Sequence, residues 1–252
     1  EINLYYKNDS LNTLYIGGGT PSCLDEISLK KLFKIISIFK LNKTYEFTFE
    51  CNIEDINEKL LIFLKENKVN RISIGLQSFN KKYIEFMNRK YLNKKEITDK
   101  INLVKKYFNN INIDLIYGIN NETLKELQEE VDSFINLDVN HISLYSLILE
   151  DNTILKTKKY KEIDDDLNRK MYDYIRKTLK KNNYIHYEIS NFSKKGYMSK
   201  HNLCYWNNDN YYGFGLGSSG FVDNIRYTNT RSLNSYINGN YRYIKEKIDK
   251  KR

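Results

Sequence analysis

The sequence predicts an α/β fold built around a parallel barrel with a polar lumen. Three observations predict it: strand-like runs alternate with helix-period segments every ~25–40 residues, as in βαβ units; the strand-like runs alternate apolar and polar residues; and polar groups stand where four of them end. The expected strands are residues 13–16, 45–50, 70–76, 111–117 and 140–147. The expected helices are residues 28–39, 57–66, 94–107 and 122–134.

The strand faces indicate which side of the barrel is apolar. Ile111, Ile113 and Leu115 alternate with Asn112 and Asp114, and the other runs follow the same pattern. Buried parallel strands are usually apolar throughout, because both of their faces are covered. Alternation with a helix after each strand favours a barrel whose outer face is apolar and whose lumen is polar. A polar lumen is not a packed core, so we expect it to hold a ligand.

The active sites of such barrels lie at the carboxyl ends of the strands. Any one polar group there is more often a helix N-cap or a surface group than a ligand. Four such ends with polar groups on the lumen side favour a ligand site. The groups are Gly17-Gly18-Gly19-Thr20, Glu50, Gln77 and Asp114.

After residue 150 the regular alternation of strand-like and helix-period segments ends. An acidic cluster at residues 164–166 begins a long helix to about residue 181, a strand is expected at residues 184–190, and a Gly/Tyr/Asn-rich segment follows. We therefore expect a barrel over residues 1–150 and an α+β extension over residues 151–252.

Composition excludes several classes of protein. The chain has 252 residues, of which 40% are hydrophobic, so it can build a sizeable core and is not wholly disordered. No stretch approaches the ~18 apolar residues of a membrane span. Three cysteines cannot form a paired disulfide framework, which indicates a reducing compartment, with the cytoplasm expected.

The net charge is +9, from 41 basic and 32 acidic residues. Such a charge favours an anionic partner, and nucleic acid is one candidate. The lysines are spread through helical stretches and the tail, however, and no nucleic-acid motif accompanies them. A solvated basic surface is the favoured interpretation, so we expect no nucleic-acid partner.

The glycine-rich loop IGGGTPS, residues 16–22, directly follows a strand. Its glycines let the backbone approach a ligand closely, although a tight turn would explain them too. It is not a P-loop, because the trailing Gly-Lys-Ser/Thr is missing. Together with FEC, ISIGLQSFN, MNRK, INIDLIYGI and HISLYSL, it resembles the coproporphyrinogen-dehydrogenase-like branch of the radical S-adenosylmethionine (SAM) proteins. The resemblance runs from about residue 11 to residue 239 and implies a partial (β/α)6 barrel.

The resemblance implies a SAM site. The loop would lie along the methionyl amino and carboxylate groups of the cofactor. Carboxylates suit the ribose hydroxyls and an ammonium group, while a guanidinium suits a carboxylate. The positions that match SAM contacts of the family are Gly17, Gly18, Gly19, Thr20, Glu50, Gln77, Arg89, Asp114 and Ile148. Of these, Ile148 would pack against the cofactor.

The second half resembles the HemW type of that family, regarded as heme chaperones. The resemblance lies in YEISNFS, HNLCYW and YGFGLGS, and HNLCYW matches the heme-associated His-Asn-x-x-Tyr-Trp motif. It implies His201 as an axial ligand of heme iron, Tyr205 and Trp206 stacked on the porphyrin, and Asn202 orienting the imidazole or binding a propionate. Cys204 is a further soft ligand candidate.

Each histidine also has a purely structural explanation. His201 can be a hydrogen-bonded structural histidine, with Trp206 packed in a core. His141 points into the lumen by strand parity but needs only a hydrogen-bond partner. His186 has no neighbour at metal-ligand spacing. We favour the heme role for His201 and a structural role for the other two.

The family's Cys-x3-Cys-x2-Cys loop, which holds a [4Fe–4S] cluster, does not occur in this sequence. Cys23, Cys51 and Cys204 are far apart and lack its spacing. We expect this chain not to cleave SAM reductively. Because residue 1 is Glu, we expect the cluster ligands upstream, and the family's C-terminal domain beyond the present end. An organelle-targeted precursor also stays open.

Three functions follow as hypotheses. The first is a heme chaperone of the HemW type, which binds SAM and heme and passes heme to client proteins. The alternative is an oxygen-independent coproporphyrinogen III oxidase, which needs the missing cluster. The third, a basic nucleic-acid-binding module, depends on the charge alone.

Overall fold

The computed structural model describes residues 1–148 and 160–248. The chain divides into two compact units. Unit 1 comprises residues 1–14, 30–46 and 199–252, and unit 2 comprises residues 15–29 and 47–198. The expected division near residue 150 stays a prediction.

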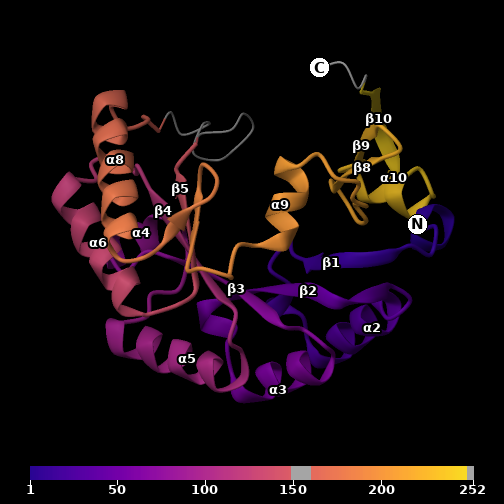
Figure 1. Cartoon of the computed structure of the whole chain (residues 1–252), viewed down its shortest axis with the longest axis horizontal. Coiled ribbons are helices and arrows are strands. Elements are labelled where there is room, and N and C mark those ends of the chain that lie inside the picture. Colours follow the sequence, from indigo (N-terminus) through magenta and orange to yellow (C-terminus); the bar gives the residue numbers. More distant parts are fainter. Residues whose placement is uncertain (149–159, 249–252) are drawn as a thin grey trace. The chain divides into compact units, whose positions relative to one another are not determined.

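The main sheet is mostly parallel (Figure 1). Strands β2 to β5 form three successive parallel ladders, and β7 runs antiparallel to both β5 and β6. A helix covers the outer side of the curved sheet after each of β2, β3 and β4. The predicted α/β partial barrel is therefore confirmed. The strands, in the order β1-β2-β3-β4-β5-β7-β6, are β1 (Ser10–Ile16), β2 (Lys40–Asn52), β3 (Arg71–Gln77), β4 (Ile111–Tyr117), β5 (His141–Ser146), β7 (Asn191–Ser193) and β6 (Ile185–His186).

The prediction of a single strand over residues 184–190 is wrong, because the chain forms the two short strands β6 and β7 in this region. The chain reverses between β6 and β7, and the Tyr187 N–H donates to the Asn191 carbonyl at 3.4 Å across the resulting hairpin. The sequence alternates through this reversal without Gly or Pro, so its pattern does not mark the turn.

Side-chain caps explain where the helices of unit 2 begin. Asn93 with Glu96, and Thr123 with Glu126, form complete capping boxes in which side chain and backbone satisfy each other. A short helix, α4, was not predicted from the sequence. The helices with residues in this unit are α2 (Glu26–Ile36), α3 (Glu58–Glu66), α4 (Lys81–Phe86), α5 (Lys94–Tyr107), α6 (Leu124–Asn136) and α8 (Asp165–Lys181), with the 3-10 turns η1 (Pro21–Cys23) and η2 (Ile53–Asp55).

The two faces of the sheet differ as predicted. The outward apolar residues, such as Phe49, Ile74 and Ile113, are fully buried under helices. The lumen face is also buried but polar, and the parallel register sets its side chains beside one another. Its buried polar residues are Thr48, Arg71, Ser73, Asn112, His141 and Ser143.

Unit 1 contains a small antiparallel sheet and short helices. The buried ring of Tyr227 lies against Gly220, where an added Cβ would come within 2.2 Å of the ring. The elements are α1 (Ile2–Tyr5), α9 (Lys200–Trp206), β8 (Ser219–Val222), β9 (Ile225–Asn229), α10 (Leu233–Ile237) and β10 (Arg242–Lys247), with the strand order β10-β9-β8. Within the described residues of both units, no helix is long and apolar enough to cross a membrane.

Candidate functional site

The glycine-rich loop of unit 2 is held against Glu50. Tyr15 donates a hydrogen bond to Glu50 Oε1 at 2.5 Å, and the Gly18 N–H donates to Glu50 Oε2 at 3.2 Å. A Cβ added at Gly17 would lie 2.5 Å from the Glu50 carboxyl carbon, so a side chain there would displace the Glu50 carboxylate. The loop and the carboxylate, 32 residues apart in the sequence, therefore form one structural element.

Asn52 joins two of the predicted SAM-contact residues. Its Oδ1 accepts hydrogen bonds from the Thr20 hydroxyl at 3.2 Å and from Arg89 Nη1 at 3.0 Å. Asn52 was not predicted as a site residue. The only sequence signal was its position two residues after Glu50 on the same strand, which places both side chains on one face.

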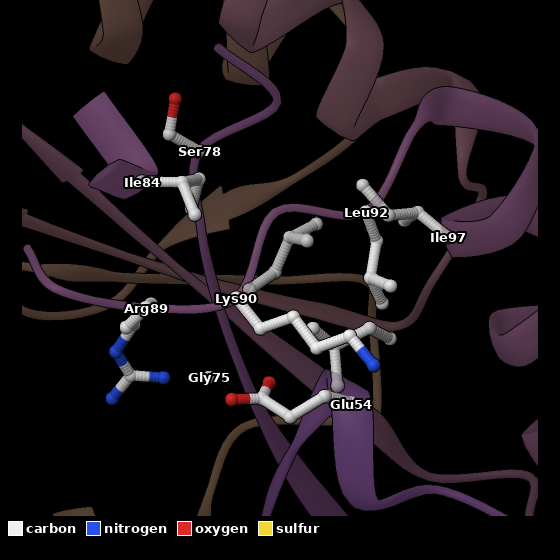
Figure 2. Close-up of a pocket in the computed structure, with 10 residues that line it drawn as sticks. Glu54, Gly75, Ser78, Ile84, Arg89, Lys90, Leu92 and Ile97 are labelled. Atoms are coloured by element: carbon white, nitrogen blue, oxygen red, sulfur yellow. The ribbon is translucent and has the colours of Figure 1, made fainter. Parts of the chain in front are cut away.

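Gln77 and Arg89 converge over Gly75. A Cβ at Gly75 would lie 3.0 Å from Gln77 Nε2 and 3.4 Å from Arg89 Nη1. Figure 2 shows Arg89 beside Gly75 in a pocket that Ser78 and Ile84 also line. Gln77 has a φ of 69°, a left-handed backbone that is uncommon for a residue other than glycine. Its buried Oε1 has no hydrogen-bond partner among the described residues, so it is available to a ligand.

Asp114 lies in the middle of β4, with Gly75 and Ser143 opposite it on the neighbouring strands. It was expected at the end of its strand. Burial raises the pKa of its carboxyl to about 6, although hydrogen bonds from Asn112 and Ser143 favour the ionised form. At neutral pH the group is a carboxylate, and it protonates in mild acid.

Asn112 organises the polar lumen around Asp114. Its amide nitrogen donates to Asp114 at 2.8 Å and to Ser73 at 2.8 Å, which leaves its Oδ1 to accept from His141 Nδ1 at 2.6 Å. His141 Nε2 then accepts from the Tyr187 hydroxyl at 2.7 Å. Burial holds the pKa of His141 well below its usual value, so the ring is neutral. His141 is thus hydrogen-bonded at both ring nitrogens, and its structural role stays a prediction.

All of the predicted SAM residues belong to unit 2, and all but one of them are linked to one another. Gly17 to Thr20, Glu50, Gln77 and Arg89 are linked directly or through Asn52 and Gly75, and the charge of Glu50 acts on Asp114. Ile148 lies beyond the end of β5 and is 76% exposed. Its packing role stays a prediction.

The HNLCYW segment forms α9 in unit 1, and a buried carboxylate holds the start of this helix. Glu46 accepts hydrogen bonds from the Ser199 hydroxyl at 3.2 Å and from the backbone N–H groups of Lys200 and His201 at 3.1 Å each. These donors have no partner inside the helix. Glu46 thereby fixes the helix that carries His201.

Both ring nitrogens of His201 have hydrogen-bond partners. Thr13 Oγ1 lies 2.9 Å from Nδ1, and the Tyr205 hydroxyl lies 2.7 Å from Nε2. Tyr205 is one helical turn after His201, so the two side chains share a face of α9. Thr13 lies 188 residues away in the sequence and was not predicted.

The aromatic residues of α9 are exposed. Tyr205 is 45% and Trp206 is 53% exposed, so the alternative in which Trp206 packs in a core is wrong. Asn202 is half-buried in the first turn of the helix. The segment therefore presents a hydrogen-bonded imidazole beside two accessible aromatic rings.

Comparison with known proteins identifies the family. The family model described as "Radical SAM superfamily" matches residues 1–134, more than half of the chain. This chain belongs to the radical SAM superfamily. It is 39% identical over 238 residues to the heme chaperone HemW of Lactococcus lactis, covering 92% of this chain and 62% of the relative. It is 36% identical over 233 residues to HemW of Bacillus subtilis, with 90% and 62% covered. These relatives place the radical SAM chain in the HemW-type branch.

A solved structure supports the radical SAM fold. Coproporphyrinogen III oxidase (HemN) from Escherichia coli matches with a TM-score of 0.81 at 19% identity, over 95% of this chain and 60% of that one. At 19% sequence identity, this similarity is evidence for a shared fold alone. The chain thus spans about three fifths of the length of the proteins it resembles.

The radical SAM family implies a [4Fe–4S] cluster, but the cysteines described here do not fit one. Cys23 is exposed, whereas Cys51 is buried and its burial raises the pKa of the thiol. Cys204 belongs to unit 1. Over residues 1–148 and 160–248, no group of three or more His, Cys, Asp or Glu side chains could hold a metal ion. No step of the function proposed below runs through a cluster.

Proposed function

We propose that this chain is the SAM- and heme-binding part of a HemW-type heme chaperone, which passes heme to client proteins. The observation that carries the proposal is the arrangement on α9, where the His201 imidazole stands beside the exposed rings of Tyr205 and Trp206. The HemW relatives support it, because each is named a heme chaperone. The three free cysteines suit a reducing cytoplasm.

Heme binding would use each side chain of the motif differently. The neutral imidazole of His201 is a suitable axial ligand for heme iron. A histidine that binds a metal commonly donates its other ring N–H to a neighbouring acceptor, and Thr13 is placed to accept from Nδ1. Trp206 and Tyr205 offer faces for porphyrin stacking, and Asn202 offers an amide to a propionate.

SAM binding would use the lumen of unit 2. When bound, SAM supplies an electrophilic sulfonium centre. The carboxylates of Glu50 and Asp114 would accept from its ribose hydroxyls and ammonium group, while Arg89 would bind its carboxylate. The unpartnered Oε1 of Gln77 and the close approach at Gly75 support a ligand at this position.

A heme titration tests the proposal. Ferric heme is added to the wild-type chain and to His201→Ala while the Soret absorbance is recorded. We expect the variant to lose the saturable Soret shift of the wild type. His186→Ala is the matched control, because His186 stacks on Phe192 at 4.3 Å in unit 2 and lies outside the HNLCYW segment. Identical titrations for wild type and His201→Ala would overturn the heme role of His201.

A further inference from the structure

The imidazole of His201 is hydrogen-bonded at both nitrogens before any iron is present. The Tyr205 hydroxyl lies 2.7 Å from Nε2, and Thr13 Oγ1 lies 2.9 Å from Nδ1. Each nitrogen of a neutral imidazole is either a donor or an acceptor, so the two contacts have opposite directions. The direction decides which nitrogen has a lone pair for iron.

The chemistry of the two hydroxyl groups fixes that direction. A phenol is more acidic than an aliphatic alcohol, so the Tyr205 hydroxyl is a stronger hydrogen-bond donor than the Thr13 hydroxyl. Tyr205 therefore donates to Nε2, and Nδ1 carries the hydrogen that Thr13 accepts. The Nε2 lone pair is therefore the one available to a metal, and Tyr205 occupies it.

We propose that Tyr205 competes with heme iron for the Nε2 lone pair of His201 and thereby keeps heme binding reversible. This inference rests on the proposed function. When iron binds, the hydrogen bond from Tyr205 to Nε2 breaks and the Nε2 lone pair coordinates the iron. The proton stays on the Tyr205 oxygen. When heme leaves, Tyr205 donates to Nε2 again.

The surroundings of Tyr205 suit a group that can move away and return. Its side chain is 45% exposed, so water can satisfy the hydroxyl after it leaves His201. On the other side, the ring packs edge-on against Tyr211 with centroids 4.6 Å apart, and Tyr211 is itself paired with Phe221 through two backbone hydrogen bonds. Tyr211 therefore gives Tyr205 a fixed neighbour to which it can return.

The size of the effect follows from the single hydrogen bond that iron must displace. One such bond changes an equilibrium constant by about 2- to 10-fold. We expect Tyr205→Phe, which keeps the ring and removes the hydroxyl, to bind ferric heme about 2- to 10-fold more tightly than the wild type. Slower heme release should account for part of the gain.

The test compares ferric heme with metal-free protoporphyrin IX on wild type, Tyr205→Phe and His201→Ala. Metal-free protoporphyrin can stack but cannot accept the Nε2 lone pair, so Tyr205→Phe should not change its affinity. Nitrogen-15 NMR of the heme-free chain gives an independent readout. It should show the Nδ1–H tautomer of His201 in the wild type and an altered Nε2 resonance in Tyr205→Phe. Thermal unfolding checks that each variant folds.

The outcomes separate this inference from the proposed function. If His201→Ala binds ferric heme like the wild type, the proposed heme site itself fails. If His201→Ala loses ferric heme but Tyr205→Phe binds it equally or more weakly, only the competition by Tyr205 fails. A gain in affinity that is the same for metal-free protoporphyrin would also overturn the competition, because the effect would then be one of stacking.

Discussion

Glu50 occupies the space that a side chain at Gly17 would need. An added Cβ would lie 2.5 Å from the Glu50 carboxyl carbon, and Glu50 also accepts hydrogen bonds from Tyr15 and the Gly18 N–H. The absence of a side chain at one residue thus allows a carboxylate from another strand to hold the predicted SAM loop.

Gly17→Ala should therefore displace Glu50 and weaken SAM binding by about tenfold or more, since at least one charge-assisted hydrogen bond is lost. Calorimetric titration with SAM measures the affinity. Gly19→Ala serves as a stability control, because no atom lies within 4 Å of a Cβ at that position. We expect Gly17→Ala to lower the unfolding midpoint and Gly19→Ala to leave it unchanged. Equal midpoints would contradict the steric argument.

Asn52→Ala should weaken SAM binding about 10-fold, because the Thr20 hydroxyl and the Arg89 guanidinium lose their shared acceptor. Asn42→Ala is the matched control. Asn42 lies on the same strand and also bonds neighbouring side chains, Ser10 and Asn12, but in unit 1. Calorimetry should find its SAM affinity equal to that of the wild type. A similar loss in both variants would argue against a specific role for Asn52.

SAM affinity should depend on pH through Asp114. Its pKa is raised to about 6, mainly by burial, so the carboxylate that would accept from SAM is lost as the pH falls below 6. Below that value the affinity should drop about tenfold per pH unit, as expected for one linked proton. The same raised pKa means that ionisation of Asp114 costs folding free energy, and this cost grows between pH 4 and 6 and is fully present above 6. Asp114→Asn should bind SAM weakly with a flat pH profile; retention of the wild-type profile would exclude Asp114 as the titrating group.

Glu46→Gln should destabilise unit 1 by about 1–3 kcal/mol, because one of the two accepting carboxylate oxygens becomes an NH2 group that faces a donor. Denaturant unfolding measures the change, and heme affinity should fall as α9 frays. Lys7→Ala removes a solvent-exposed ion pair with Asp223 in the same unit and should leave the midpoint unchanged. An unchanged midpoint for Glu46→Gln would show that the helix is held by other contacts.

Trp206→Ala should weaken ferric heme and metal-free protoporphyrin alike by about 2- to 10-fold, because stacking is lost while His201 remains. Stability should hardly change, since the Trp206 side chain is 53% exposed. Tyr243→Ala is the matched control, because Tyr243 is an aromatic residue of unit 1 that is 79% exposed and distant in sequence from the motif. Absorbance titration with each porphyrin gives the affinities, and an equal loss in both variants would indicate nonspecific adsorption.

Strand faces could be predicted from the sequence because the side-chain period of a strand is two. Asn112 and Asp114 alternate with Ile111 and Ile113; the two isoleucines are buried under helices, whereas Asn112 and Asp114 hydrogen-bond each other on the lumen face. The hairpin between β6 and β7 could not be predicted, because backbone hydrogen bonds reverse the chain there without a Gly or Pro signal.

The barrel, its polar lumen, the family and the chemical types of the proposed site residues can be predicted from the amino-acid sequence, because they depend on local periodicity and on motifs within short segments. How those residues act on one another depends on tertiary contacts. Glu50 meets Gly17 across 32 residues, and Thr13 meets His201 across 188, through contacts that no local pattern encodes. The tautomer of His201 in particular depends on Thr13 and Tyr205 together, because a ring nitrogen becomes a donor or an acceptor according to the groups that face it.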